Sequence, residues 1–211
     1  MTAPARKTAA TASRPAEVIA DGQLLRHIAR DAAEICETAF RYAKRGWRVI
    51  PLHGIRDGQC TCQEWRDKNG KGPCPTPGKH PRFRNWQERA SRDPTAIEEM
   101  WWNHKGSNVG VATGAASGVF VLDVDPKNGG EESVDALIAK HGRLPDTLQA
   151  ITGSGGRHFY FAHPGKLVKN GVALLPGLDV RGDGGLVVAP PSMHVSGRQY
   201  EWDGLAEFAD M

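Results

Sequence analysis

The chain has 211 residues, enough for one domain or for a main domain with a smaller lobe. Its 39% hydrophobic and 24% charged residues are typical of a soluble globular protein. No apolar run approaches the roughly 20 residues of a membrane helix, and the N-terminus lacks the apolar core of a secretory signal. The sequence therefore offers no candidate membrane helix and predicts a cytoplasmic protein without a membrane partner.

The net charge of +3 is unevenly distributed. Between Arg41 and Arg92 there are 13 Lys or Arg and 4 Asp or Glu, a local balance of +9, so the remainder sums to −6. A basic segment beside an acidic one suggests a polyanion held next to a bound metal. A solvated basic loop explains the charge alone equally well.

The N-terminal part of the chain divides into a tail and a helix. Residues 1–21 are rich in Ala, Thr and Pro, which predicts a disordered tail before a single folded domain over 22–211. Apolar side chains recur at helical spacing over 23–45, and Gly46 is a plausible C-terminal stop.

After residue 45, the sequence pattern predicts a series of strands and two helices, with a strand-rich core over 108–203. Asp93 and Pro94 read as the N-cap and first turn of a helix that extends to about Lys105, and residues 131–140 form a short helix. Strands are predicted at 47–52, 108–113, 118–125, 147–152, 158–163, 177–181 and 185–189, the last two as a pair around Gly182-Asp183-Gly184. This order predicts an α+β fold with a mainly antiparallel sheet.

A long loop over residues 53–85 contains three of the four cysteines. Cys60, Cys62 and Cys74 have the spacing C-x-C-x11-C, and His80 follows after five residues. Three thiolates and one imidazole satisfy tetrahedral Zn²⁺, and a loop of this length is usually functional or braced by a metal. The alternative is reduced thiols in an exposed loop. Cys36, alone in the helical pattern, is predicted to be a small core residue.

Two carboxylates, Asp123 and Asp125, end an apolar strand. Side chains alternate along a strand, so both lie on one face, where they repel each other unless a cation sits between them. Oxygen ligands suit Mg²⁺ or Mn²⁺, and Asp179 is a candidate third ligand. The alternative is a pair of solvated residues at the turn that follows.

Two further motifs place polar side chains near strands. Arg157 and His158 follow a glycine-rich turn containing Ser154 and Gly155, and this combination suits contact with phosphate oxygens. His158 is predicted to share a face with Tyr160. Asp179 and Arg181 also share one strand face; they are either a solvated ion pair or a metal ligand beside a phosphate contact.

Taken in order, these motifs resemble the bifunctional DNA primase/polymerase (Prim-Pol) family of the archaeo-eukaryotic primase superfamily, whose domains occur in replication proteins of phages and plasmids. The similarity covers about residues 40–202. Its pieces are AKRGWRVIPL (43–52), PGKHP (77–81), NVGVATG (108–114), LDVD (122–125), SGGRH (154–158), DVRG (179–182) and APPS (189–192).

The resemblance implies an RRM-like catalytic sheet with an additional α/β lobe. It implies that Asp123, Asp125 and Asp179 carry two divalent ions and that His158, with Arg181 as a further contact, touches the incoming dNTP or NTP. The reaction would be attack of a 3′-hydroxyl on the α-phosphate, directed by a single-stranded DNA template, and the basic segment would hold template or primer.

Two features depart from fuller members of the family. The chain has no Walker motif, so a helicase is expected as a partner or domain outside it, and it ends soon after Trp202, which predicts an excised catalytic module. Two other functions fit part of the pattern: a D-x-D glycosyltransferase explains the acidic pair, and a non-catalytic zinc-containing DNA-binding module explains the basic loop.

Overall fold

The computed structural model describes residues 33–62 and 74–204. They form a mixed α+β fold in which every strand pairing is antiparallel, as the sequence predicts. The predicted disordered tail over residues 1–21 lies outside the described part of the chain, as does the first portion of the helix predicted over 23–45. Within the described residues, no helix has the length and apolar character needed to span a membrane.

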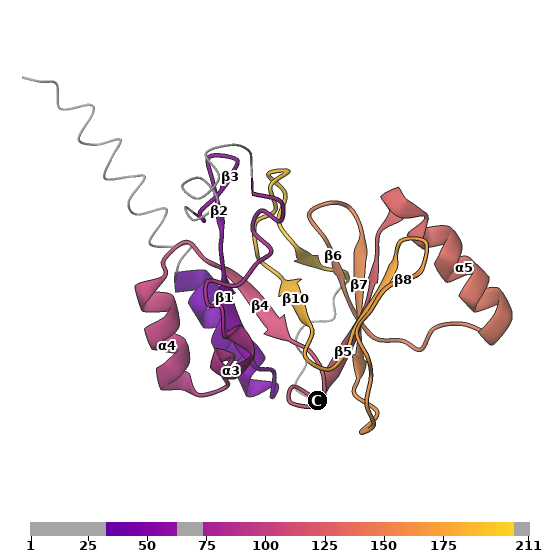
Figure 1. Cartoon of the computed structure of the whole chain (residues 1–211), viewed down its shortest axis with the longest axis horizontal. Coiled ribbons are helices and arrows are strands. Elements are labelled where there is room, and N and C mark those ends of the chain that lie inside the picture. Colours follow the sequence, from indigo (N-terminus) through magenta and orange to yellow (C-terminus); the bar gives the residue numbers. More distant parts are fainter. Residues whose placement is uncertain (1–32, 63–73, 205–211) are drawn as a thin grey trace, which may run out of the picture.

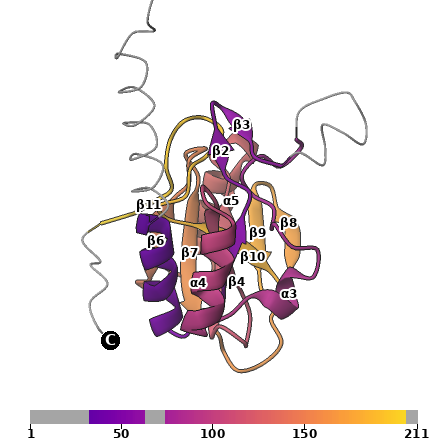
Figure 2. The ribbon, with the colours of Figure 1, turned by 90° about the vertical axis from the view of Figure 1, so that its left-hand side faces the viewer.

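A three-stranded sheet and its helices form one side of the molecule (Figure 1). Strand β4 (Asn108–Ala112) is central and pairs with β1 (Val49–Leu52) and β10 (Leu186–Ala189). Residues 33–44 are helical and end before Gly46, whose φ of 88° is the left-handed conformation expected of a helix stop. Figure 2 shows this helix and α4 (Pro94–Asn103) lying in front of the sheet.

The N-terminus of α4 forms as the sequence predicts. The Asp93 side chain accepts a hydrogen bond from the backbone N–H of Ala96 at 2.8 Å, and Pro94 occupies the first turn. Ile97 and Trp101 are the buried side chains of the helix, four residues apart and therefore on one face. A short helix, α3 (Trp86–Arg89), precedes it.

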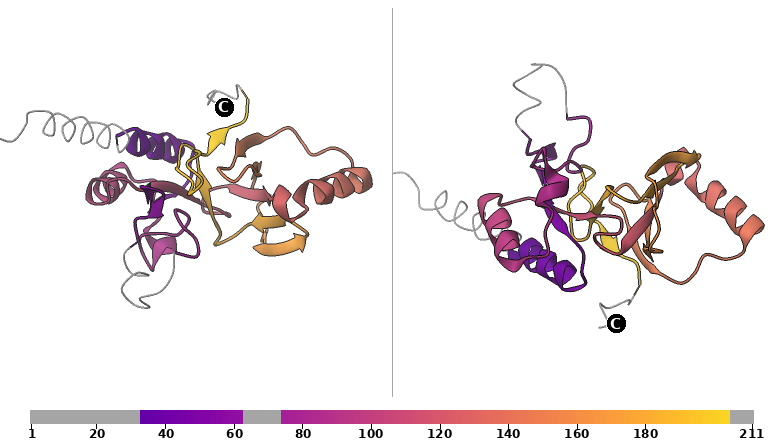
Figure 3. Two further views of the ribbon diagram at one scale, coloured as in Figure 1. Left: turned by 90° about the horizontal axis from the view of Figure 1, so that it is seen from above. Right: turned by 60° about the horizontal axis from the view of Figure 1, so that its bottom comes forward.

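A six-stranded sheet forms the other side of the molecule, with α5 (Gly130–His141) at its outer end (Figure 1). Its strand order is β11 (Glu201–Trp202), β6 (Leu148–Ile151), β7 (Arg157–Ala162), β5 (Val119–Val124), β9 (Leu178–Arg181) and β8 (Gly171–Leu175). The central strand β5 is followed by a short 3₁₀ turn, η1 (Pro126–Asn128). Two views in Figure 3 show the two sheets side by side with α5 farthest from the first helices.

Alternation along the strands separates two cores. Leu122, Val124 and Phe159 pack with Val134 of α5, together with part of Phe161. Val119, Val121 and Tyr160 join the core of the three-stranded sheet instead, where Tyr160 stacks on Trp47 with ring centroids 5.4 Å apart. Phe159 thus faces the opposite side from Tyr160, and the prediction that His158 shares a face with Tyr160 is confirmed by their ring centroids, which lie 6.2 Å apart.

Two pairings differ from the sequence prediction. Residues 178–181 and 186–189 do not pair with each other, because β9 pairs with β5 and β8 whereas β10 pairs with β4 of the other sheet. The predicted long loop contains a small hairpin, β2 (Ile55–Arg56) with β3 (Gln59–Cys60), and the edge strand β8 was not predicted.

The side chain of Asp183 holds the turn after β9, where the chain passes from the six-stranded sheet to the three-stranded sheet. One carboxylate oxygen accepts the N–H of Ala115 at 2.9 Å, and the other accepts the N–H of Val168 at 2.8 Å and lies 3.1 Å from Nε2 of His163. These backbone hydrogen bonds, followed by the side-chain bond to His163, lower the pKa of Asp183 from 3.8 to about 2. One carboxylate thus ties three loops together.

We expect Asp183→Asn to lower the melting temperature by several degrees, because the amide nitrogen cannot accept the hydrogen bonds that the second carboxylate oxygen accepts. Since the folded pKa of about 2 lies below the unfolded value of 3.8, this stabilisation is present above pH 3.8 and is lost as the pH falls toward 2. Thermal unfolding followed at a series of acidic pH values should show a flatter pH dependence for the variant. Asp203→Asn, at an exposed position, is the control, and equal melting temperatures would contradict the role of Asp183.

Candidate active site

The register of the central strand β5 brings together acidic and basic side chains from three strands. Asp123 lies opposite His158 of β7 on one side and opposite Asp179 of β9 on the other. Directly paired residues share a face, so these three side chains form one row across the sheet. Arg181, two residues after Asp179, lies on the same face and opposite Val121.

Asp123 is held as a carboxylate by contacts with His158 and Arg181. Its Oδ1 is 3.4 Å from Nε2 of His158, and its Oδ2 accepts a hydrogen bond from Nη2 of Arg181 at 3.2 Å. Burial by itself raises the pKa, but the hydrogen bond and charge of His158 and then those of Arg181 outweigh it and lower the pKa from 3.8 to about 2. Asp123 is therefore ionised, and able to bind a cation, across the whole neutral range.

Asp179 is positioned from two directions. Its Oδ1 accepts the backbone N–H of Ala173 in the edge strand β8 at 2.7 Å, and its Oδ2 accepts from Nη2 of Arg181 at 2.8 Å. The guanidinium of Arg181 thus lies between Asp179 and Asp123 and compensates both carboxylates. The carboxylates of Asp123 and Asp179 supply hard oxygen donors on neighbouring strands. Mg²⁺ and Mn²⁺ prefer ligands of this kind.

Asp125 lies just after the end of β5 and caps the turn that follows. Its side chain accepts the N–H of Lys127 at 3.0 Å and the Nδ2 of Asn128 at 2.7 Å. The sequence predicts Asp125 in the strand; the strand ends one residue earlier, at Val124. Its carboxylate is hydrogen bonded to the turn, whereas those of Asp123 and Asp179 share Arg181.

The predicted phosphate-binding turn lies beside the end of β5. A Cβ on Gly156 would come within 2.4 Å of the carbonyl oxygen of Val124, so glycine allows this close approach. Ser154 Oγ is 2.9 Å from Thr152 Oγ1, and Gly155 has a φ of 92°. Arg157 is not brought to the row: it alternates away from His158 and forms an ion pair with Glu131 of α5.

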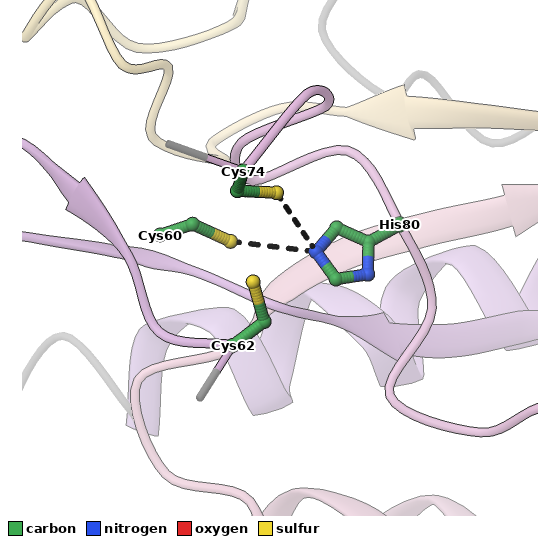
Figure 4. A group of neighbouring side chains, drawn as sticks. All are labelled: Cys60, Cys62, Cys74 and His80. Atoms are coloured by element: carbon green, nitrogen blue, oxygen red, sulfur yellow. Dashed lines mark hydrogen bonds between the residues drawn. The ribbon is translucent and has the colours of Figure 1, made fainter. Parts of the chain in front are cut away.

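A second group of chemistry-bearing side chains gathers in the hairpin and loop before α3. The ligand atoms of Cys60, Cys62, Cys74 and His80 all lie within 4.8 Å of one another (Figure 4). Nε2 of His80 is 3.4 Å from Sγ of Cys60 and 3.5 Å from Sγ of Cys74. The four predicted ligands are therefore brought to one point, although residues 63–73 between them lie outside the described chain.

The geometry and the donor set fit zinc. Tetrahedral zinc with ordinary Zn–S and Zn–N bond lengths requires sulfur and nitrogen about 3.5 Å apart. Burial, and then the neighbouring sulfurs of Cys60 and Cys74, raise the pKa of the Cys62 thiol well above its usual range. A central divalent cation reverses this effect because it binds thiolates, so the cluster can hold a metal and is consistent with zinc.

A hairpin-like segment that the sequence analysis did not single out also borders the row. Tyr200 places its ring 6.1 Å from that of His158 and 6.1 Å from that of His194. Arg198 donates from Nε to the carbonyl of Gly153 in the glycine-rich turn before β7 at 3.0 Å. The sequence does show a His, an Arg and a Tyr close together around Ser196-Gly197. It gives no indication that they lie near the acidic residues, because the segment has no alternating strand pattern.

We expect the purified protein to contain about one zinc per chain, measured by elemental analysis. Cys74→Ser should remove most of it, because the hydroxyl does not provide a thiolate ligand. Cys36→Ser, on the first helix, should retain the full amount and controls for general effects on folding. Absence of zinc from the parent protein, or unchanged zinc in Cys74→Ser, would refute the assignment.

The sequence of the chain was compared with models of known protein families. The chain matches the family model "Bifunctional DNA primase/polymerase, N-terminal" (Prim-Pol) over residues 39–211, most of its length. No curated protein matched the chain. The matched range includes the whole row on β5, β7 and β9 as well as the Cys/His cluster. The chain therefore belongs to the Prim-Pol family of DNA primase/polymerase domains.

Proposed function

We propose that this chain is a template-directed nucleotidyltransferase that adds nucleotides to a 3′-hydroxyl and releases pyrophosphate. The observation that carries the proposal is the register of β5, which aligns Asp123 with both His158 and Asp179 in a chain of the Prim-Pol family. Family membership supports DNA and nucleotide substrates, and the row supplies the oxygen and cationic contacts that this chemistry needs.

The carboxylates of Asp123, Asp125 and Asp179 are the proposed ligands of two Mg²⁺ or Mn²⁺ ions. When bound, such ions lower the pKa of the attacking hydroxyl and stabilise the departing pyrophosphate. Asp123 enters this role already ionised, and Asp179 is held by the backbone of β8. The protein thus presents fixed oxygen donors from two neighbouring strands.

His158 and Arg181 are the proposed contacts to the triphosphate. His158 is buried, and its Nε2 faces Asp123. Arg181 donates hydrogen bonds to both Asp123 and Asp179 in the structure, and its guanidinium would be free to contact a phosphate oxygen if these carboxylates held a metal ion instead. Ser154 and Gly155 lie in the adjoining turn and are proposed to approach the same phosphates.

We further propose that the six-stranded sheet contains the RRM-like catalytic sheet of the family and that the bound metal of the Cys/His cluster is structural zinc. A phage- or plasmid-type replication protein acting in the cytoplasm of a bacterial cell, with single-stranded template, primer and a helicase outside this chain, is the setting that best fits the family. The basic segment over residues 41–92 supports template or primer binding through phosphate contacts.

We expect Asp123→Asn to lower primer extension by roughly 10³-fold, because it removes one negative metal ligand without changing the side-chain shape. The assay uses a primed single-stranded template, labelled dNTPs or NTPs, and Mg²⁺ or Mn²⁺. Asp135→Asn, exposed on α5, is the matched control and should extend normally. DNA binding by the parent protein without any extension under these conditions would instead favour a non-catalytic module.

A further inference from the structure

Three positively charged residues belong to separate segments that meet near His194. Lys79 lies in the Cys/His loop, Lys127 follows the end of β5, and Arg198 belongs to the segment before β11. His194 is buried, and its backbone N–H donates to the carbonyl of Arg198 at 2.9 Å. Burial, followed by the charges of Lys79, Lys127 and Arg198, lowers the pKa of His194. Within the described chain, no acidic side chain forms an ion pair with any of them.

The backbone fixes this group against the phosphate-binding turn. A Cβ on Gly153 would lie 2.1 Å from Cβ of His194, and Arg198 donates to the carbonyl of Gly153 at 3.0 Å. Ser196 Oγ donates to the same carbonyl at 2.8 Å. The turn leads directly into His158. The packed backbone therefore places this group next to the row formed by Asp123, His158 and Asp179.

Asn108 joins the two sides of the group. Its Nδ2 donates to the carbonyls of Gly78 at 2.9 Å and Met193 at 2.8 Å, and its Oδ1 accepts the N–H of Met193 at 2.9 Å. The residues that follow these two are Lys79 and His194, so one buried amide sets their separation. His80, next along the chain, belongs to the Cys/His cluster, and the metal loop thereby fixes the backbone that carries Lys79.

We propose that Lys79, Lys127 and Arg198 form a polyphosphate-binding wall around His194, which holds the outer phosphates of the incoming nucleotide. This assignment rests on the proposed function. Like charges gathered from three segments repel each other unless an anion lies among them. Lys127 is two residues from Asp125, so a triphosphate whose inner end lies at the carboxylates reaches the wall with its outer end.

The test compares nucleotide affinity with nucleic-acid affinity. Binding of dATP with Mg²⁺ is measured by calorimetry, and binding of a labelled single-stranded oligonucleotide by fluorescence anisotropy. We expect Lys79→Ala and Arg198→Ala each to weaken dATP binding about tenfold, and the double variant to weaken it further. Oligonucleotide affinity should be unchanged, and inorganic tripolyphosphate should compete with dATP for the parent protein.

Two variants sharpen the comparison. Lys79→Arg keeps the charge and should retain most of the affinity, whereas Lys140→Ala removes an exposed charge from α5 and should change nothing. In primer extension, the wall variants should raise KM for the nucleotide while kcat changes little, since the metal ligands are intact.

The outcomes separate this inference from the function on which it rests. If the parent protein binds dATP and extends primers but the wall variants keep full nucleotide affinity, the wall is refuted and the proposed function stands. If those variants lose oligonucleotide affinity instead, the cations hold template or primer phosphates, and the assignment to the nucleotide is wrong. A parent protein that neither binds dATP nor extends primers overturns both proposals.

Discussion

The candidate active site depends on the register of one central strand. Strand β5 pairs with β7 on one side and with β9 on the other, which places Asp123 opposite both His158 and Asp179. Because side chains alternate, a slip of one residue would turn Asp123 toward α5 and bring Leu122 to the polar row. Burial of Leu122 and Val124 against α5 opposes that slip, so the apolar core fixes the position of the carboxylate.

The sequence predicted the local elements well because each carries its own signal. Alternation predicted β5 and β7, and Asp93 with Pro94 predicted the start of α4. Which strands pair was harder to predict. A short glycine-rich turn typical of a hairpin separates β9 from β10, yet Asp183 ties this turn to other loops and the two strands belong to different sheets. Such long-range hydrogen bonds leave no periodic pattern in the sequence.

Site residues could be predicted where reactive side chains recur at a distinctive spacing within one strand or one loop. The Cys/His cluster follows from the rarity and spacing of its residues, and the structure brings all four together. Strand β8 was missed because its apolar residues are not buried: Val172 and Leu174 are 73% and 60% exposed, so no buried face produces an alternating pattern. Yet β8 supplies the N–H of Ala173 that positions Asp179. Backbone contributions of this kind are independent of residue type and are therefore invisible in the sequence.

The charges of the three carboxylates and Arg181 indicate how binding of metal ions and nucleotide would depend on each other. Asp123 and Asp179 share the single positive charge of Arg181, and the carboxylate of Asp125, two residues after Asp123, is hydrogen bonded to a turn. Two divalent ions at these three carboxylates would reverse the local excess of charge from negative to positive, and Arg181 would add to that excess. A nucleoside triphosphate supplies the compensating negative charge. Under the proposed function, these carboxylates would therefore hold a second cation more favourably with the nucleotide present than without it, and Arg181 would then be free to contact the phosphates.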